Sequence, residues 1–170
     1  MSHKKSNSSH SKSPATGQAG STSSALRALS NQNIRGVHFL REGNLDEAVN
    51  VLRGLVMPPG CTWTRPDAPN LYKRNFATAL LLAGHPSGCL ELLAEMRDEQ
   101  HPRVQQLRAA IKRWEKTLSF FQWLNWRTGW IEPANHPVTI DFIPGELEGE
   151  QLRSEDVTTG SASSRLSTSV

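Results

Sequence analysis

The feature that most constrains this chain is a helical hairpin pattern that occurs twice. Each copy has a small residue, a large residue three positions later, and a second small and large pair beyond a glycine turn. The members are Gly36, Phe39, Ala48 and Leu52 in the first copy, and Ala77, Leu80, Cys89 and Leu93 in the second. Apolar residues at such spacings predict helices. Small residues at matching places allow two antiparallel helices to pack closely.

The same periodicity predicts helices over residues 25–42, 45–57, 70–83, 86–96 and 102–127. Glycine and proline mark their ends, with Gly43, Gly84 and Gly129 as stops. Asn44 followed by Glu47 has the spacing of a capping box, and Asn70 is the expected N-cap of the third helix. After the fifth helix, apolar residues alternate with polar ones, which predicts a short extended segment over residues 137–143.

The two hairpins resemble tetratricopeptide repeats, whose signature alternates small and large residues around a turn. The first resembles that family closely over residues 41–48. The second departs from it, because residues 85–88 replace the usual acidic start of the second helix. The copies stand 41 positions apart, against the family's period of about 34. The stretch from Trp126 to Gly145 resembles in outline uncharacterised bacterial proteins that carry such repeats, and it implies no activity.

The resemblance implies an all-α fold, a short solenoid of helical hairpins capped by the long helix 102–127. It also implies a concave groove lined by the first helix of each hairpin. Carried onto this chain, that lining is Asn33, Val37, Leu40, Arg41, Arg74, Thr78, Leu81 and Leu82. The set lacks the paired Lys/Asn pattern by which some relatives clamp a terminal carboxylate. A protein or peptide partner with an apolar or mixed surface is therefore expected. The alternative is that Val37 and Leu81 pack against the fifth helix.

Composition sets the expected domain boundaries. Residues 1–24 and 149–170 are poor in large apolar side chains, which predicts disordered tails around one domain over residues 25–148. The net charge of +3 divides into a basic front and an acidic end. Such ends are usually solvated, although they can also attract partners. No secretory signal is expected, and two cysteines form no disulfide framework. We therefore expect a soluble cytoplasmic protein.

The fifth predicted helix supports an alternative function. It is basic and rich in tryptophan, and at 100° per residue Phe120, Trp123 and Trp126 point away from its apolar seam. The residues that would bind a polyanion, either an anionic membrane or a nucleic acid, are Arg108, Lys112, Arg113, Lys116, Trp123 and Trp126. Residues 138–142 can instead fold back over this face. A third possibility is a homodimer through it, since two repeats alone bury little core.

No catalytic site is expected. The sequence contains no phosphate-binding loop, dinucleotide fingerprint or zinc-protease motif. His85 and Cys89 have the spacing of two metal ligands on one helix, but a structural metal needs four ligands. Cys89 also stands where the repeat requires a small residue, so packing explains it. We therefore expect no cofactor, no metal and no small-molecule substrate.

Overall fold

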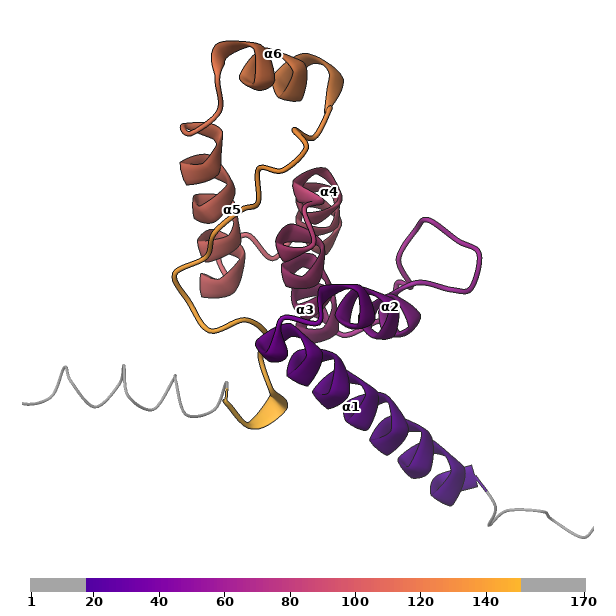
Figure 1. Cartoon of the computed structure of the whole chain (residues 1–170). Coiled ribbons are helices and arrows are strands. Elements are labelled where there is room, and N and C mark those ends of the chain that lie inside the picture. Colours follow the sequence, from indigo (N-terminus) through magenta and orange to yellow (C-terminus); the bar gives the residue numbers. More distant parts are fainter. Residues whose placement is uncertain (1–17, 151–170) are drawn as a thin grey trace, which may run out of the picture.

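A computed structural model describes residues 18–150, and the side chains from residue 23 onward. This part of the chain is all-helical and has no strand. Its helices are α1 (Gln18–Glu42), α2 (Leu45–Val56), α3 (Asn70–Leu82), α4 (Pro86–Met96), α5 (Pro102–Glu115) and α6 (Phe120–Gly129). Successive helices from α1 to α4 pack side by side, and α5 packs against α3 and α4 (Figure 1).

Small residues bring the helices of each hairpin together, as the sequence pattern predicted. A Cβ atom on Gly36 would lie only 2.6 Å from Leu52 Cγ, so α1 and α2 meet there without room for a side chain. In the second hairpin Ala77 and Cys89 are both fully buried. The turns between the paired helices use Gly43 and Gly84 at φ +80° and +88°, a backbone conformation that favours glycine.

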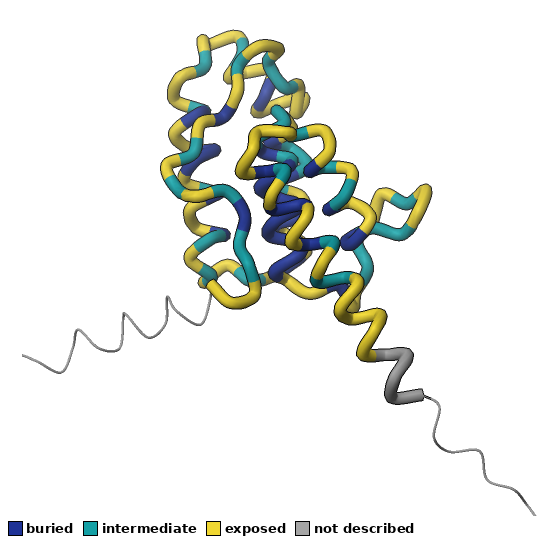
Figure 2. Tube along the Cα trace, turned by 60° about the horizontal axis from the view of Figure 1, so that its bottom comes forward, coloured by how far each residue is buried: buried dark blue, intermediate teal, exposed yellow. Residues whose placement is uncertain are grey.

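The third helix lies at the centre of the core. Every residue from Leu71 to Ala79 is buried, and Figure 2 shows this stretch enclosed by its neighbours. The buried residues include Lys73, Arg74 and Asn75, which are polar. Buried polar groups need partners, and for Arg74 and Asn75 the partners come from the end of the described chain.

The prediction of one long helix over residues 102–127 is wrong. The chain forms two helices instead, and residues 116–119 separate them. Ser119 starts α6 with a capping box: its hydroxyl accepts a bond from the Gln122 amide, and the Gln122 side chain accepts one from the Ser119 amide. Such a cap satisfies donors that a continuous helix would bond internally, and so it favours a new start. The predicted capping helix is therefore α5 alone.

Several local predictions also differ from the structure. Helix α1 begins at Gln18, whereas the sequence predicted a disordered tail up to residue 24. Asn44 makes no capping bond; its side chain donates to Glu42, and α2 starts at Leu45 without it. The cap position of α3 is Pro69, not Asn70. The remaining tail predictions, over residues 1–17 and 151–170, lie outside the described residues.

The segment predicted to be extended, residues 137–143, runs as irregular chain along the helices. Val138 is buried, and Ile140 and Phe142 pack against the core. The Trp114 indole donates to the carbonyl of His136 at 2.8 Å, and Arg113 pairs with Asp141 at 2.9 Å. The segment therefore folds back over α5. Within residues 18–150, no helix is long and apolar enough to cross a bilayer.

Candidate functional site

The described chain ends in an acidic stretch that lies across the first helices of both hairpins. We call residues 144–150 the C-terminal segment; in Figure 1 it is the yellow stretch beside α1. The residues that hold it form the segment-binding surface. Its main residues are Asn33, Val37 and Arg41 of α1, Tyr72, Arg74 and Asn75 of α3, and Arg103 of α5.

Asn75 binds the main chain of the segment. Its Nδ2 donates to the carbonyl of Glu146 at 2.9 Å, and its Oδ1 accepts from the Glu146 amide at 2.7 Å. The same Nδ2 also donates to Oδ1 of Asn33 at 2.9 Å. Both asparagines are completely buried. A side-chain amide thus satisfies both backbone groups of one residue, as a neighbouring strand would.

Two arginines hold the Glu146 carboxylate. Arg74 donates to it through Nε at 2.9 Å and pairs with Asp98 through Nη1 at 3.0 Å. Arg103 Nε lies 3.7 Å from the other carboxylate oxygen. Burial lowers the pKa of the Arg103 guanidinium, and the charge of Glu146 opposes that effect. The cluster excludes much water, so each charge depends on its partner.

The outer part of the segment is bound by α1 and Tyr72. Arg41 donates to the carbonyl of Pro144 at 3.2 Å and pairs with Glu150 at 2.9 Å. The Tyr72 hydroxyl donates to Glu148 at 2.9 Å. Burial, then this hydrogen bond and the charge of Glu148, raise the pKa of Tyr72 to about 12. Burial would raise the pKa of Glu150, but the bonds from Arg41 and the Leu147 amide outweigh it and hold that pKa low.

Gly145 brings the segment into close contact with α1. Its φ is +75°, and a Cβ atom there would lie 2.8 Å from Val37 Cγ1. An L side chain is disfavoured by the backbone conformation and excluded by the contact. Gly149, by comparison, has nothing within 4 Å of the position of a Cβ atom.

The predicted groove residues divide into two groups. Asn33, Val37, Arg41 and Arg74 contact the C-terminal segment or its anchor. The other four make no hydrogen bond or ion pair with the described part of the segment. Leu40, Thr78 and Leu81 are buried in the helical core, and Leu82 lines a pocket elsewhere.

Sequence reasoning missed Tyr72, Asn75 and Arg103 as members of this surface. One signal was available for Asn75, since a polar residue within an otherwise buried helix needs a partner. Nothing local in the sequence pointed to residues 144–150 as that partner.

The residues predicted to bind a polyanion are not brought together on one face. Arg113 pairs with Asp141, and Arg108 lies 3.6 Å from Glu99. Trp126 is only 2% exposed; its ring packs edge-on against Trp114 and its indole donates to Glu115 at 2.8 Å. The exposed members of the set are Lys112, Arg113, Lys116 and Trp123.

Helix α6 nevertheless exposes a cluster of apolar side chains, which we call the aromatic surface. Its members are Phe120, Phe121, Trp123, Leu124, Trp130 and Ile131. Phe121 is 75% exposed, and the rings of Phe120 and Trp123 stack at 6.4 Å. The fold-back of residues 138–142 covers α5 but leaves these side chains in solvent. The helix lies across the end of α5 (Figure 1).

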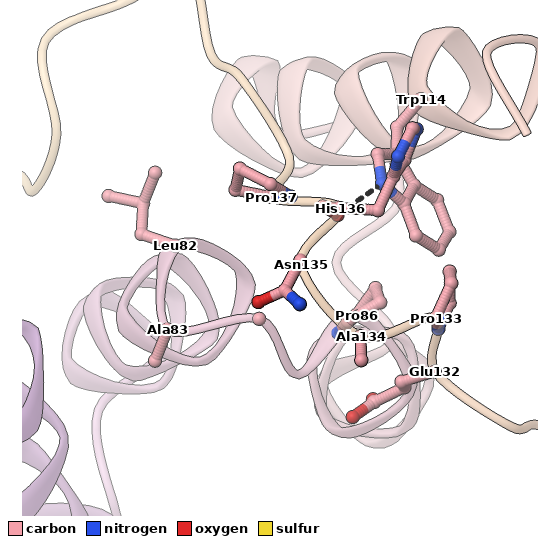
Figure 3. Close-up of a pocket in the computed structure, with 11 residues that line it drawn as sticks. Leu82, Ala83, Pro86, Trp114, Glu132, Pro133, Ala134, Asn135, His136 and Pro137 are labelled. Carbon is pink, nitrogen blue, oxygen red and sulfur yellow. Dashed lines mark hydrogen bonds between the residues drawn. The ribbon is translucent and has the colours of Figure 1, made fainter.

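An open pocket of about 380 Å³ lies between the α3–α4 turn, α5 and the loop before Val138. Figure 3 shows Asn135 reaching into it between Leu82, Trp114 and Pro86. The acid in its wall, Glu132, already accepts bonds from the amide and the hydroxyl of Ser87 and lies 3.2 Å from His85. The pocket is therefore open, and the one acid among its lining residues is already bonded within the chain.

The predicted pair of His85 and Cys89 is not brought together by the fold. His85 contacts Glu132 at the surface, while Cys89 is buried in the core, so the two do not converge. Burial raises the pKa of the Cys89 thiol to about 12, which keeps it protonated. No group of three His, Cys, Asp or Glu side chains within residues 18–150 could hold a metal ion. Comparison with protein-family models, curated proteins and solved structures finds no match for this chain.

Proposed function

We propose that this chain is a non-catalytic protein-interaction module that binds a polypeptide segment along the first helices of two tetratricopeptide-like hairpins. One observation carries the proposal: the C-terminal segment already lies there, with its main chain bonded by Asn75 and a carboxylate held by Arg74. The surface is mixed, with apolar Val37 beside cations. Its natural ligand is therefore a polypeptide that offers both backbone groups and acids.

The kind of contact favours a ligand-binding surface over ordinary core packing. Core segments are held mainly by apolar burial, and residues 138–142 fit that description, since Val138 is buried and Phe142 packs on the core. The next residues are held by hydrogen bonds and ion pairs to three helices. Such contacts confer specificity more than net stability, which is the usual balance in peptide recognition.

The test uses the full chain with Gly145→Ala and Glu146→Ala, the release variant, in which the C-terminal segment loses its fit against Val37 and its bond to Arg74. A library of short random peptides is screened against this variant and against the same variant carrying Asn75→Leu. We expect enrichment of a peptide class only where Asn75 is present. Equal recovery on both proteins would contradict the proposed function.

The aromatic surface supports a second candidate function, binding to an anionic lipid surface. Phe120, Trp123 and Trp130 are exposed, and residues 116–131 contain Lys116 and Arg127 but no acid. Aromatic rings flanked by cations are typical of interfacial helices. A homodimer through this face would bring Lys116 and Arg127 of two copies together, and residues 116–131 offer no acid to pair with them.

Flotation of the full chain with vesicles that contain anionic lipid tests this second function. We expect binding that weakens with salt and is lost in Trp123→Ala and in Lys116→Glu. Binding to single-stranded oligonucleotides but not to vesicles would assign the surface to nucleic acid instead.

A further inference from the structure

The segment-binding surface has more hydrogen-bond donors than the C-terminal segment satisfies. Nδ2 of Asn33 and both Nε and Nη1 of Arg103 are buried and have no acceptor in the described part of the chain. The Arg103–Glu146 approach of 3.7 Å is an ion pair beyond hydrogen-bonding distance. Buried donors without acceptors are unfavourable. A ligand that brings further acceptors would therefore bind this surface better than the chain's own segment does.

The surface also restricts the sequence of its ligand at two adjacent positions. The first must be glycine, because φ is +75° and Val37 leaves no room for a Cβ atom. The second must be acidic, because Arg74 and Arg103 meet the Glu146 carboxylate. Asn75 fixes the register of the ligand, because its side chain bonds the backbone amide and carbonyl of the second of these residues.

Further acids follow at every second position. Glu148 accepts bonds from Tyr72 at 2.9 Å and from Ser30 at 3.1 Å. Glu150 pairs with Arg41 at 2.9 Å, and its side chain is 52% exposed. These outer contacts are more solvated than the one at Glu146. They add to affinity and orientation but select less strongly.

We propose that the surface binds, in a partner protein, an acidic segment in which glycine is followed by glutamate and by further acids at alternate positions. The C-terminal segment of this chain occupies the surface as a weaker stand-in. This inference rests on the proposed function and names the chemistry of its ligand. A partner segment with an additional carboxylate or carbonyl near Arg103 and Asn33 would displace residues 144–150.

Departure of the segment uncovers Val37 but does not remove the larger apolar side chains that pack on the core before it. Its apolar anchors, Val138 and Phe142, precede it in the chain and stay in place. A tethered stand-in competes at a high effective concentration, so it lowers the apparent affinity for any ligand in solution. Partners therefore bind the unmodified chain only when they offer more contacts than the stand-in.

A labelled peptide with the sequence of Ile143–Glu150 is the probe, and its binding is followed by fluorescence anisotropy. We expect the release variant to bind it at least about tenfold more tightly than the unmodified chain does, because the stand-in no longer competes. Replacing the probe's first glutamate by glutamine, or its first glycine by alanine, should each weaken binding about tenfold or more. The matched control is Gly149→Ala, which should behave as the unmodified chain.

Circular dichroism must show that the release variant keeps its helices. If it does not, Glu150→Gln, which weakens the exposed pair with Arg41, takes its place, with a smaller gain of about two- to threefold expected. Equal binding of the altered and unaltered probes would overturn this inference. Enrichment of library peptides without binding of the probe would overturn it and leave the proposed function standing. Failure of every peptide would contradict both, and a complex of the release variant with a second copy of this chain would overturn the assignment to a partner protein.

Discussion

The segment-binding surface and the aromatic surface of α6 differ in how they meet water. The first is made mainly of polar side chains that lie under the chain's own residues 144–150. The second is made of apolar side chains that remain in solvent. A polar surface binds only what matches its hydrogen bonds, whereas an apolar one associates with whatever excludes water. The comparison assigns specific recognition to the first surface and less selective adhesion to the second.

The largest expected effect separates two tryptophans of α6. Trp126 packs against Trp114 and Trp130, with ring centroids 5.3 and 5.2 Å away. Trp126→Ala should lower the free energy of unfolding by about 3–5 kcal/mol. Trp123→Ala, at an exposed position, should change it by less than about 1 kcal/mol. Urea denaturation of both variants makes the measurement. Equal losses of unfolding free energy in the two variants would contradict the view that α6 is anchored through Trp126 alone.

The next effect concerns the buried amide. Asn75→Leu removes three hydrogen bonds and leaves groups of Asn33 and Glu146 without partners, which should cost about 3 kcal/mol. The control, Asn50→Leu on the exposed side of α2, should stay within about 0.5 kcal/mol. A loss no greater than that of the control would mean that the segment is not held through its main chain.

A smaller effect is the titration of Tyr72, the only tyrosine of the chain. Its absorbance near 295 nm should titrate with a pKa of about 12, raised by burial and by Glu148. Because the folded chain favours the neutral phenol, this contribution to stability is complete below pH 10 and is lost as the pH rises from 10 towards 12. Glu148→Gln should lower the pKa of Tyr72 without restoring the ordinary value of a tyrosine, since burial persists. An unchanged pKa would contradict the Tyr72–Glu148 bond.

The boundaries of α2, α3 and α4 could be predicted from the sequence because proline and glycine act locally. Pro86 starts α4, and Gly43 and Gly84 form the turns that the pattern indicated. The break before α6 could also have been found, since Ser119 and Gln122 have the spacing of a capping box. The position of the C-terminal segment could not, because Asn75 and Glu146 meet across 71 positions of chain and neither carries a local signal for the other. For the same reason only three of the eight predicted groove residues contact the segment: periodicity gives a helix face, but not what covers it.

Hydrogen exchange of the Glu146 amide tests the central claim most directly, that residues 144–150 are docked on the first helices of both hairpins. This amide donates to Asn75 Oδ1 at 2.7 Å, in a partly buried bond. In the unmodified chain, NMR should show its exchange slowed about 100-fold or more relative to an unstructured peptide. In Asn75→Leu that protection should disappear, while amides in the middle of α3 stay protected. Exchange of the Glu146 amide at the unstructured rate in the unmodified chain would contradict the account.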